Sequence, residues 1–363
     1  MHSSPLLSIS IPTYNRMKYL ERLLTILYDE QSANDPRVEL IVSDNVSTDG
    51  TRAVVEDFIR RGMKLRYVCN EINRGGDDNF CRCYSRMRGK YVWIVGDDDV
   101  IAPGALQKIL SLLEASEYDL LFLAPYQFPA AGDQFLPRRR LKPDVLKVTT
   151  SSLRLVDLID TYSDFIFITA VIINKERANI QVDLASYVDG NIVQMAWILS
   201  VLKNLRRGMF VDAQWVGMGT FNAVGGYDGS HFYGSRFKKA LNCWLEPDSP
   251  LAKKLTNNHL TMWAFVWLEW KWHSTSKVKI AVADAHRNLL PVYGRNPRYW
   301  LCVYPLIVLP EFLARVWAVP WLVRRKLLRL WYQAITPSLK LEAPRNREAP
   351  VYTETPGKIA KGK

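Results

Sequence analysis

The sequence predicts an α/β fold that begins with a mostly parallel sheet covered by helices on both faces. Short apolar runs alternate with segments of helical periodicity about every 20–30 residues through roughly the first 125 residues, the pattern of strand–helix–strand units. Polar turns follow three of these apolar runs, at the end where such sheets bind ligands. Beyond about residue 245 the pattern becomes helical, so we also expect a helical C-terminal extension.

The expected elements follow one another regularly. Strands are expected over residues 6–11, 38–42, 65–69, 91–95 and 119–124. Helices are expected over residues 17–27, 51–61, 77 to about 88, and 103–115. Pro103 suits the first turn of its helix, and the polar residues 47–50 offer an N-cap for the helix that follows them.

Three consecutive acids, Asp97, Asp98 and Asp99, follow the fourth strand directly after Gly96. Adjacent carboxylates repel one another and acids are rarely buried unpaired, so a positive charge must offset them. Mg²⁺ or Mn²⁺ bound by oxygen ligands would do this and would also hold a substrate phosphate. The alternative is a solvated acidic turn, which is seldom found at the carboxyl end of so apolar a strand.

Polar side chains at the ends of strands 1, 2 and 4 are expected to converge. Thr13, Asp44 and the three acids each follow a strand of the predicted parallel sheet, so they must lie along one edge of it. Taken singly, Asp44 is equally consistent with a simple turn. The sequence has no Gly-x-Gly-x-x-Gly after strand 1 and no Gly-Lys-Ser/Thr loop. A bound nucleotide would therefore be held by side chains and a metal.

The charge is basic and unevenly distributed. The chain has 363 residues and a formal net charge of +12, and its last 66 residues contain 12 Lys/Arg against 4 Asp/Glu. Such an end suits an anionic surface, either membrane or nucleic acid, but no nucleic-acid-binding motif accompanies it. The five cysteines are scattered without zinc spacing, which indicates free thiols in a reducing compartment. The N-terminus lacks the pattern of a signal peptide, so we expect a cytoplasmic protein.

The C-terminal third combines aromatic residues with basic ones. Residues 299–323 are apolar but broken by prolines and charges, and the longest uncharged run, 299–310, is too short to span a bilayer. Tryptophans beside a basic cluster suit a helix lying on an anionic membrane surface. They are Trp300, Trp317, Trp321 and Trp331, with Arg324, Arg325, Lys326 and Arg329. The alternative is a buried helical pair that covers the sheet.

Four segments together resemble family 2 glycosyltransferases of the GT-A fold, whose sheet is Rossmann-like. They are residues 8–16 (SISIPTYNR), residues 39–51 (ELIVSDNVSTDGT), Asn73-Arg74-Gly75 with Asn79, and the Gly96–Asp99 turn. Within the family the chain is most similar to the abequosyltransferase branch, which builds O-antigen repeat units. The resemblance is strong over residues 6–125, weaker over residues 173–188, and not evident beyond about residue 230.

The resemblance implies roles for particular residues. Nucleotide-sugar contacts are expected from Pro12, Thr13, Tyr14, Asn15, Asp44, Asn73, Gly75, Asp97 and Asp98, with Thr13 and Asp44 holding the nucleoside. Metal contacts are expected from Asp97, Asp98 and Asp99. The family usually has an acid where this chain has Gly96, and Asp97 is the candidate to replace it, so which two acids bind the metal stays open.

An inverting transfer also needs a carboxylate base that takes the proton of the acceptor hydroxyl. Asp189 falls where the family usually has this base, although the abequosyltransferase branch has a small residue there. Asp183 is the second candidate, and the alternative role of Asp189 is to cap the next helix.

These observations predict a metal-dependent inverting glycosyltransferase that moves a sugar from a nucleotide-diphosphate donor to a lipid-linked saccharide, on the inner face of the cell membrane. Residues 1–125 would bind the donor, 126–245 the acceptor and 246–335 the membrane, and residues 336–363 would be a disordered tail. The rival is a non-catalytic sugar-nucleotide or polysaccharide-binding protein on the same fold. A nucleotidyltransferase would usually carry a glycine-rich loop and a lysine after strand 1, which are absent.

Overall fold

A computed structural model describes most of the chain. The described residues are 4–29, 34–127, 144–160, 166–178, 180, 192–219, 232–272, 282–335, 338–341 and 352–355. Asp183 and Asp189, the two candidates for the carboxylate base, lie outside them.

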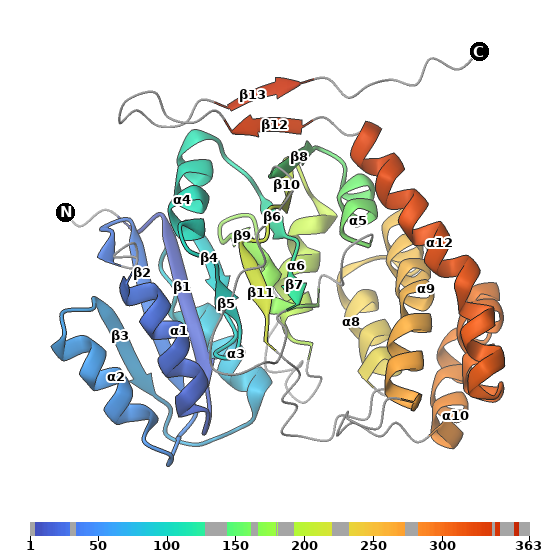
Figure 1. Ribbon diagram of the computed structural model, residues 1–363, viewed down its shortest axis with the longest axis horizontal. Coiled ribbons are helices and arrows are strands. Elements are labelled where there is room, and N and C mark those ends of the chain that lie inside the picture. The colour runs from blue at the N-terminus through green and yellow to red at the C-terminus, as the bar shows by residue number, and fades with distance from the viewer. Residues whose placement is uncertain are drawn as a thin grey trace.

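A ten-stranded mixed sheet forms the centre of the molecule, in the order β13-β12-β8-β10-β6-β9-β4-β1-β2-β3 (Figure 1). Its strands are β1 Leu7–Thr13, β2 Val38–Asp44, β3 Leu65–Cys69, β4 Tyr91–Ile94, β6 Leu120–Leu123, β8 Val145–Thr149, β9 Val171–Asn174, β10 Gly208–Asp212, β12 Ser338–Leu341 and β13 Tyr352–Thr355. Strands β3, β2, β1 and β4 are mutually parallel, as the sequence predicts.

The sheet departs from the sequence prediction next to β4. The strand at residues 119–124 was expected to extend the parallel sheet, but β9 lies between β4 and β6 and runs antiparallel to both. Strand β6 is parallel to β10 on its other side. Strands β9 and β10, both from beyond residue 126, thus flank β6, because both edges of a buried strand need backbone partners.

Helices cover both faces of this sheet, so that alternate residues of β4 enter different cores. Tyr91 and Trp93 pack with β1, α1 Met17–Asp29 and α4 Ala105–Ala115. Val92 and Ile94 pack on the other face with α3 Gly76–Arg86, α5 Ser152–Asp160 and α6 Gln194–Lys203. All four β4 side chains are buried, which confirms the reading of this run as a strand covered on both sides.

Smaller elements complete the sheet layer. Helix α2 Thr51–Arg60 packs beside α1. The short strands β5 Val100–Ile101, β7 Tyr126–Gln127 and β11 Val216–Met218 form a second sheet in the order β5-β11-β7. The one-turn helix η2 Ile168–Ala170 leads into β9, and the indole of Trp93 donates a hydrogen bond of 2.9 Å to the carbonyl of Thr169 within it.

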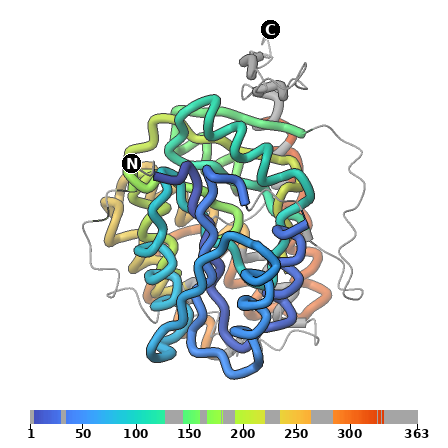
Figure 2. Tube along the Cα trace, turned by 90° about the vertical axis from the view of Figure 1, so that its left-hand side faces the viewer, coloured from blue at the N-terminus to red at the C-terminus, as the bar shows by residue number. Residues whose placement is uncertain are grey.

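The C-terminal region is helical, as predicted, and has a hydrophobic cluster of its own. Its elements are η4 Phe232–Arg236, α8 Phe237–Trp244, α9 Pro250–Trp272, α10 Val282–Tyr293, η5 Tyr299–Val303, α11 Tyr304–Val308 and α12 Glu311–Ile335. Helix α12 is outermost, on the opposite side of the molecule from β3, and packs along α9 (Figure 1). In Figure 2 the N-terminal strands and helices lie toward the viewer and the C-terminal helices lie behind them.

Two short strands occur where the sequence predicted a disordered tail. Strand β12 runs antiparallel to β8, and β13 runs antiparallel to β12. The edge of β8 offers backbone groups that an extended segment can pair with, whatever its hydrophobic pattern. Composition alone does not reveal such an edge.

Candidate active site

The acidic turn begins where β4 ends, beside the carboxyl end of β1. The backbone N–H of Val95 donates to the carbonyl of Ser10 at 3.0 Å, and the N–H of Asp99 closes the turn on the carbonyl of Gly96 at 3.1 Å. A Cβ on residue 96 would lie 2.6 Å from Oδ2 of Asp99. The turn therefore has no space for the acid that the resemblance expected at this position.

Asp97 is buried and is held by Thr13 at the end of β1 and by Arg16 in the turn that follows. Thr13 donates its hydroxyl to Oδ2 of Asp97 at 2.8 Å, and Arg16 donates to Oδ1 at 2.8 Å. Burial raises the pKa of Asp97 to about 6, against the lowering effect of Arg16. The contact with Thr13 confirms that the turns after strands 1 and 4 meet.

Asp98 is the acid of the three that faces outward. Its side chain is 23% exposed, against 4% for Asp97, and its Oδ2 lies 3.2 Å from Nη2 of Arg16. Arg22 donates to the main-chain carbonyl of Asp98 at 2.7 Å and so fixes the backbone without using the carboxylate. Although burial lowers the pKa of the Arg16 guanidinium, the two acids outweigh that effect and raise it.

Asp99 points into the protein and joins the turn to other elements. Its Oδ2 accepts a hydrogen bond from the hydroxyl of Thr169 in η2, and its Oδ1 accepts one of 3.0 Å from the N–H of Gly219 beyond β11. The Thr169 hydroxyl also accepts from the N–H of Gly96 at 2.9 Å. Burial, followed by the charge of Asp98, raises the pKa of Asp99 well above its usual range. Both carboxylate oxygens thus have partners within the protein.

The described part of the acidic turn offers a divalent metal few protein ligands. Among the described residues, no three acid, histidine or cysteine side chains form a group able to hold a metal alone. Mg²⁺ usually takes one or two protein carboxylates and completes its shell with water and substrate phosphate oxygens. The outward carboxylate of Asp98, with Asp97 beside it, fits that second kind of site, in which the ligand supplies the remaining oxygens.

Asp44 lies on the same edge of the sheet. It ends β2 and is in register with Thr13 at the end of β1. Its Oδ1 accepts a hydrogen bond of 2.9 Å from the N–H of Ser47, and its Oδ2 accepts one from the hydroxyl of Tyr67 in β3. Burial and the hydrogen bond to Asp44 raise the pKa of the Tyr67 hydroxyl, so it remains a donor at neutral pH. The carboxylate of Asp44 is therefore held in one orientation.

The remaining predicted contact residues lie in β1 and in the turns after β1 and β3. Asn73 accepts a hydrogen bond of 2.6 Å from the side chain of Asn45 and another of 2.9 Å from the N–H of Gly75, which adopts a φ of 92° suited to glycine. Tyr14 follows β1 and is 47% exposed, so its ring is available at the edge. Asn15 adopts a φ of 51° and accepts from the N–H of Thr48 at 2.8 Å. Pro12 is buried in β1.

Three residues of this site were not singled out from the sequence. Arg16 and Thr169 contact the acids, and Tyr67 contacts Asp44. Arg16 was visible as part of the quoted SISIPTYNR segment, but nothing local connects it to acids 81 positions away. Tyr67 reads as a strand residue, and Thr169 as part of an apolar run.

The fold and this site define a class of protein. A mostly parallel sheet with an acidic turn and a further aspartate at its carboxyl edge is the arrangement of GT-A glycosyltransferases. Residues 8–175 match the family described as "Glycosyl transferase family 2". This part of the chain is therefore a family 2 glycosyltransferase domain.

Relatives of this domain include named bacterial glycosyltransferases. The chain is 37% identical over 111 residues to the abequosyltransferase RfbV of Salmonella typhimurium, covering 30% of this chain and 33% of the relative. It is 29% identical over 107 residues to GalNAc(5)-diNAcBac-PP-undecaprenol beta-1,3-glucosyltransferase of Campylobacter jejuni, covering 29% and 34%. The chain thus spans about a third of the length of these relatives.

Solved structures share the fold over a much longer stretch. The crystal structure of Staphylococcus aureus TarS 1-349 in complex with UDP-GlcNAc matches with a TM-score of 0.56 and 18% identity, covering 96% of this chain and 99% of that one. A mannosyltransferase from Pyrobaculum calidifontis in complex with GDP-Man and Mn²⁺ matches with a TM-score of 0.50 and 14% identity, covering 91% and 88%. At these identities the likeness establishes the fold alone.

Proposed function

We propose that this protein is an inverting glycosyltransferase that moves a sugar from a nucleoside-diphosphate donor to a lipid-linked saccharide during surface polysaccharide synthesis. The observation that carries the proposal is the outward carboxylate of Asp98, in a turn whose other two acids are held by Thr13 and Thr169. The names of the relatives support the class of reaction, and that of the undecaprenol-linked glucosyltransferase supports a lipid-linked acceptor.

The residues of the site would have different roles in the reaction. Asp44, oriented by Tyr67 and Ser47, would accept hydrogen bonds from the nucleoside. Asp98, with Asp97, would hold Mg²⁺ or Mn²⁺, which offsets charge on the departing diphosphate when bound. Asp99 would keep the turn in position through Thr169. A carboxylate base, Asp189 or Asp183, would take the proton of the acceptor hydroxyl as it attacks the anomeric carbon.

Donor turnover by the purified protein tests this proposal. Asp98→Asn removes the outward charge but keeps the shape, and should lower kcat roughly a hundredfold or more, as should a metal chelator. Asp57→Asn is the matched control, because Asp57 is a half-exposed acid of α2 paired with Arg60. Full turnover in chelator would remove the metal from the proposal. Donor binding without turnover by the wild-type protein would favour the non-catalytic rival.

The choice of base is tested separately by Asp189→Asn and Asp183→Asn. The variant that loses the base should retain donor affinity and lose turnover, since the base acts only on the acceptor. If neither substitution changes kcat, the base lies elsewhere.

We further propose that the C-terminal helices bind an anionic lipid bilayer. Among the described residues, thirteen of the eighteen exposed large hydrophobic side chains lie between residues 300 and 331, so they are clustered in one part of the chain. Those on α12 are Phe312, Leu313, Val316, Trp317, Val319, Leu322, Val323, Leu327, Leu330 and Trp331. Within the described residues no helix is both long and apolar enough to cross a membrane.

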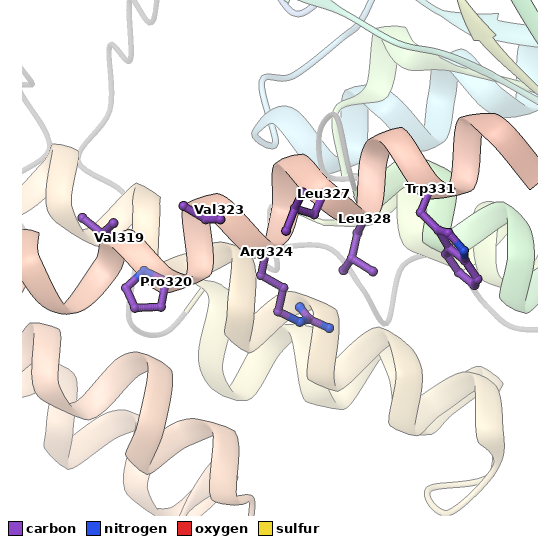
Figure 3. Close-up of a pocket in the computed structure, with 7 residues that line it drawn as sticks. All are labelled: Val319, Pro320, Val323, Arg324, Leu327, Leu328 and Trp331. Atoms are coloured by element: carbon purple, nitrogen blue, oxygen red, sulfur yellow. The ribbon is translucent and has the colours of Figure 1, made fainter.

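A groove along α12 suits binding to an anionic lipid bilayer. It has a volume of about 570 Å³ and is lined by Val319, Pro320, Val323, Arg324, Leu327, Leu328 and Trp331 (Figure 3). All of these except Arg324 are apolar, and they repeat every three to four residues along the helix. Apolar side chains flanking an exposed guanidinium match the boundary between acyl chains and anionic headgroups.

Vesicle binding tests the membrane proposal. The double substitution Leu327→Glu with Leu330→Glu should weaken binding to anionic vesicles by roughly thirtyfold, since each leucine contributes about 1 kcal/mol when half of it enters the lipid. Ile59→Glu with Ile72→Glu is the matched control, because these exposed residues lie in the N-terminal half. Binding should also fall as salt rises. A wild-type protein that ignores anionic vesicles at low salt but dimerises through this face would overturn the proposal.

A further inference from the structure

Arg16 bridges two carboxylates of the acidic turn. It lies in the turn between β1 and α1, and its Nη1 lies 2.8 Å from Oδ1 of Asp97 while its Nη2 lies 3.2 Å from Oδ2 of Asp98. The side chain is 26% exposed and its guanidinium stands 5.5 Å from the ring centre of Tyr19. The same two acids are the ones that fit a metal shared with a diphosphate.

We propose that Arg16 is the resident counter-ion of the acidic turn and makes metal binding conditional on the donor. This inference rests on the proposed function, because it concerns the order in which the same site is filled. A dication that reached Asp98 alone would lie beside a guanidinium, and the two like charges repel each other. The diphosphate of a nucleotide-sugar donor carries negative charge that offsets the dication, so the metal and the donor are accommodated together.

The contacts allow Asp98 to change partners without moving the turn. Its backbone is held by Arg22, which donates to the main-chain carbonyl rather than to the carboxylate. Rotation of the Asp98 side chain from Arg16 to a metal therefore leaves the main chain in place.

Asp97 would keep Arg16 in position during this exchange. Asp97 is anchored by Thr13 and binds Nη1 of Arg16, so the guanidinium stays at the site when Asp98 turns away. Its second nitrogen would then be available to a diphosphate oxygen, and the planar fork of arginine suits two acceptors at once. Arg16 thus acts as a positioning residue that exchanges a carboxylate for a phosphate oxygen.

Binding of Mn²⁺ without any nucleotide tests this inference directly. Calorimetric titration should show Arg16→Gln binding Mn²⁺ alone roughly tenfold more tightly than wild type, a coupling of the usual size. Arg16→Lys retains the positive charge, so its Mn²⁺ affinity should stay near that of wild type. Arg37→Gln is the control, because Arg37 also bridges two acids, Asp35 and Glu114, but away from the turn.

Nucleotide binding gives the second measurement. In chelator, the tightest binder among UDP, CDP, GDP and dTDP should bind Arg16→Gln roughly tenfold more weakly than wild type, because the phosphate loses its cationic partner. Equal Mn²⁺ affinities for folded Arg16→Gln and wild type would overturn the inference. If wild type turns over a donor and the Mn²⁺ affinity does not change, the inference alone fails. If the affinity changes but no donor is turned over, the proposed function fails and the role of Arg16 stands.

Discussion

Thr169 offers a sharp test of how the acidic turn is held. Its side chain is fully buried and its hydroxyl serves two partners, donating to Asp99 and accepting from the N–H of Gly96. The substitution Thr169→Val keeps the shape and removes both hydrogen bonds. It leaves a buried carboxylate oxygen and a backbone N–H without these partners.

The expected loss of stability follows from those two groups. A buried polar group that loses its partner costs about 1–3 kcal/mol, so two of them cost about 4 kcal/mol. A typical domain is stable by about 5–15 kcal/mol, which makes the effect large but compatible with folding. Donor turnover should fall as well, because the turn that carries Asp98 is then less well held.

Urea unfolding followed by tryptophan fluorescence would measure this loss. Thr25→Val is the matched control, since the Thr25 hydroxyl is exposed and bonds only to the carbonyl of Glu21 in its own helix. The control should change the free energy of unfolding by about 0.5 kcal/mol or less. A loss below about 1 kcal/mol for Thr169→Val would refute the reasoning, because Asp99 and Gly96 would then be satisfied in another way.

Three further predictions concern single residues. Tyr67→Phe should weaken nucleoside-diphosphate binding by about tenfold with little change in kcat, because Asp44 loses the donor that orients it. Unchanged affinity in calorimetry would mean that Asp44 does not bind the nucleoside. Gly96→Ala should cost about 1–3 kcal/mol in urea unfolding, since the new Cβ would lie 2.6 Å from Oδ2 of Asp99; a neutral result would mean that the turn is looser than described. Burial alone would raise the pKa of Glu39, but hydrogen bonds from Ser8 and Arg88 outweigh burial and lower it. The charged form therefore stabilises the fold above about pH 4.5, and this stabilisation is lost as the pH falls through the lowered pKa. Glu39→Gln should be less stable than wild type at pH 7, and its free energy of unfolding should fall less steeply as the pH is lowered. Identical dependence of the free energy of unfolding on pH in the two proteins would contradict this.

Local sequence patterns were sufficient to predict the strands and helices of the N-terminal half. The strand expected at 65–69 coincides with β3, and the helix expected at 51–61 differs from α2 by one residue. Each depends on an apolar periodicity that is complete within the segment. The edge shared by Thr13, Asp44 and the acids could also be predicted, because parallel strands all end on the same side.

The sequence by itself determined which chemistry is concentrated at the sheet edge. Three acids follow the buried strand at residues 91–95, and Asp44 follows the strand at residues 38–42. Only the tertiary structure decided how these groups differ. Asp97, Asp98 and Asp99 are equivalent in a linear chain, but one is held by Arg16 and Thr13, one faces outward, and one is bound by Thr169. Their partners come from positions 70 to 84 residues away, and β9 enters the sheet from beyond residue 170. Burial and pairing of a charge depend on what surrounds it in space, and no local periodicity encodes contacts between segments so far apart.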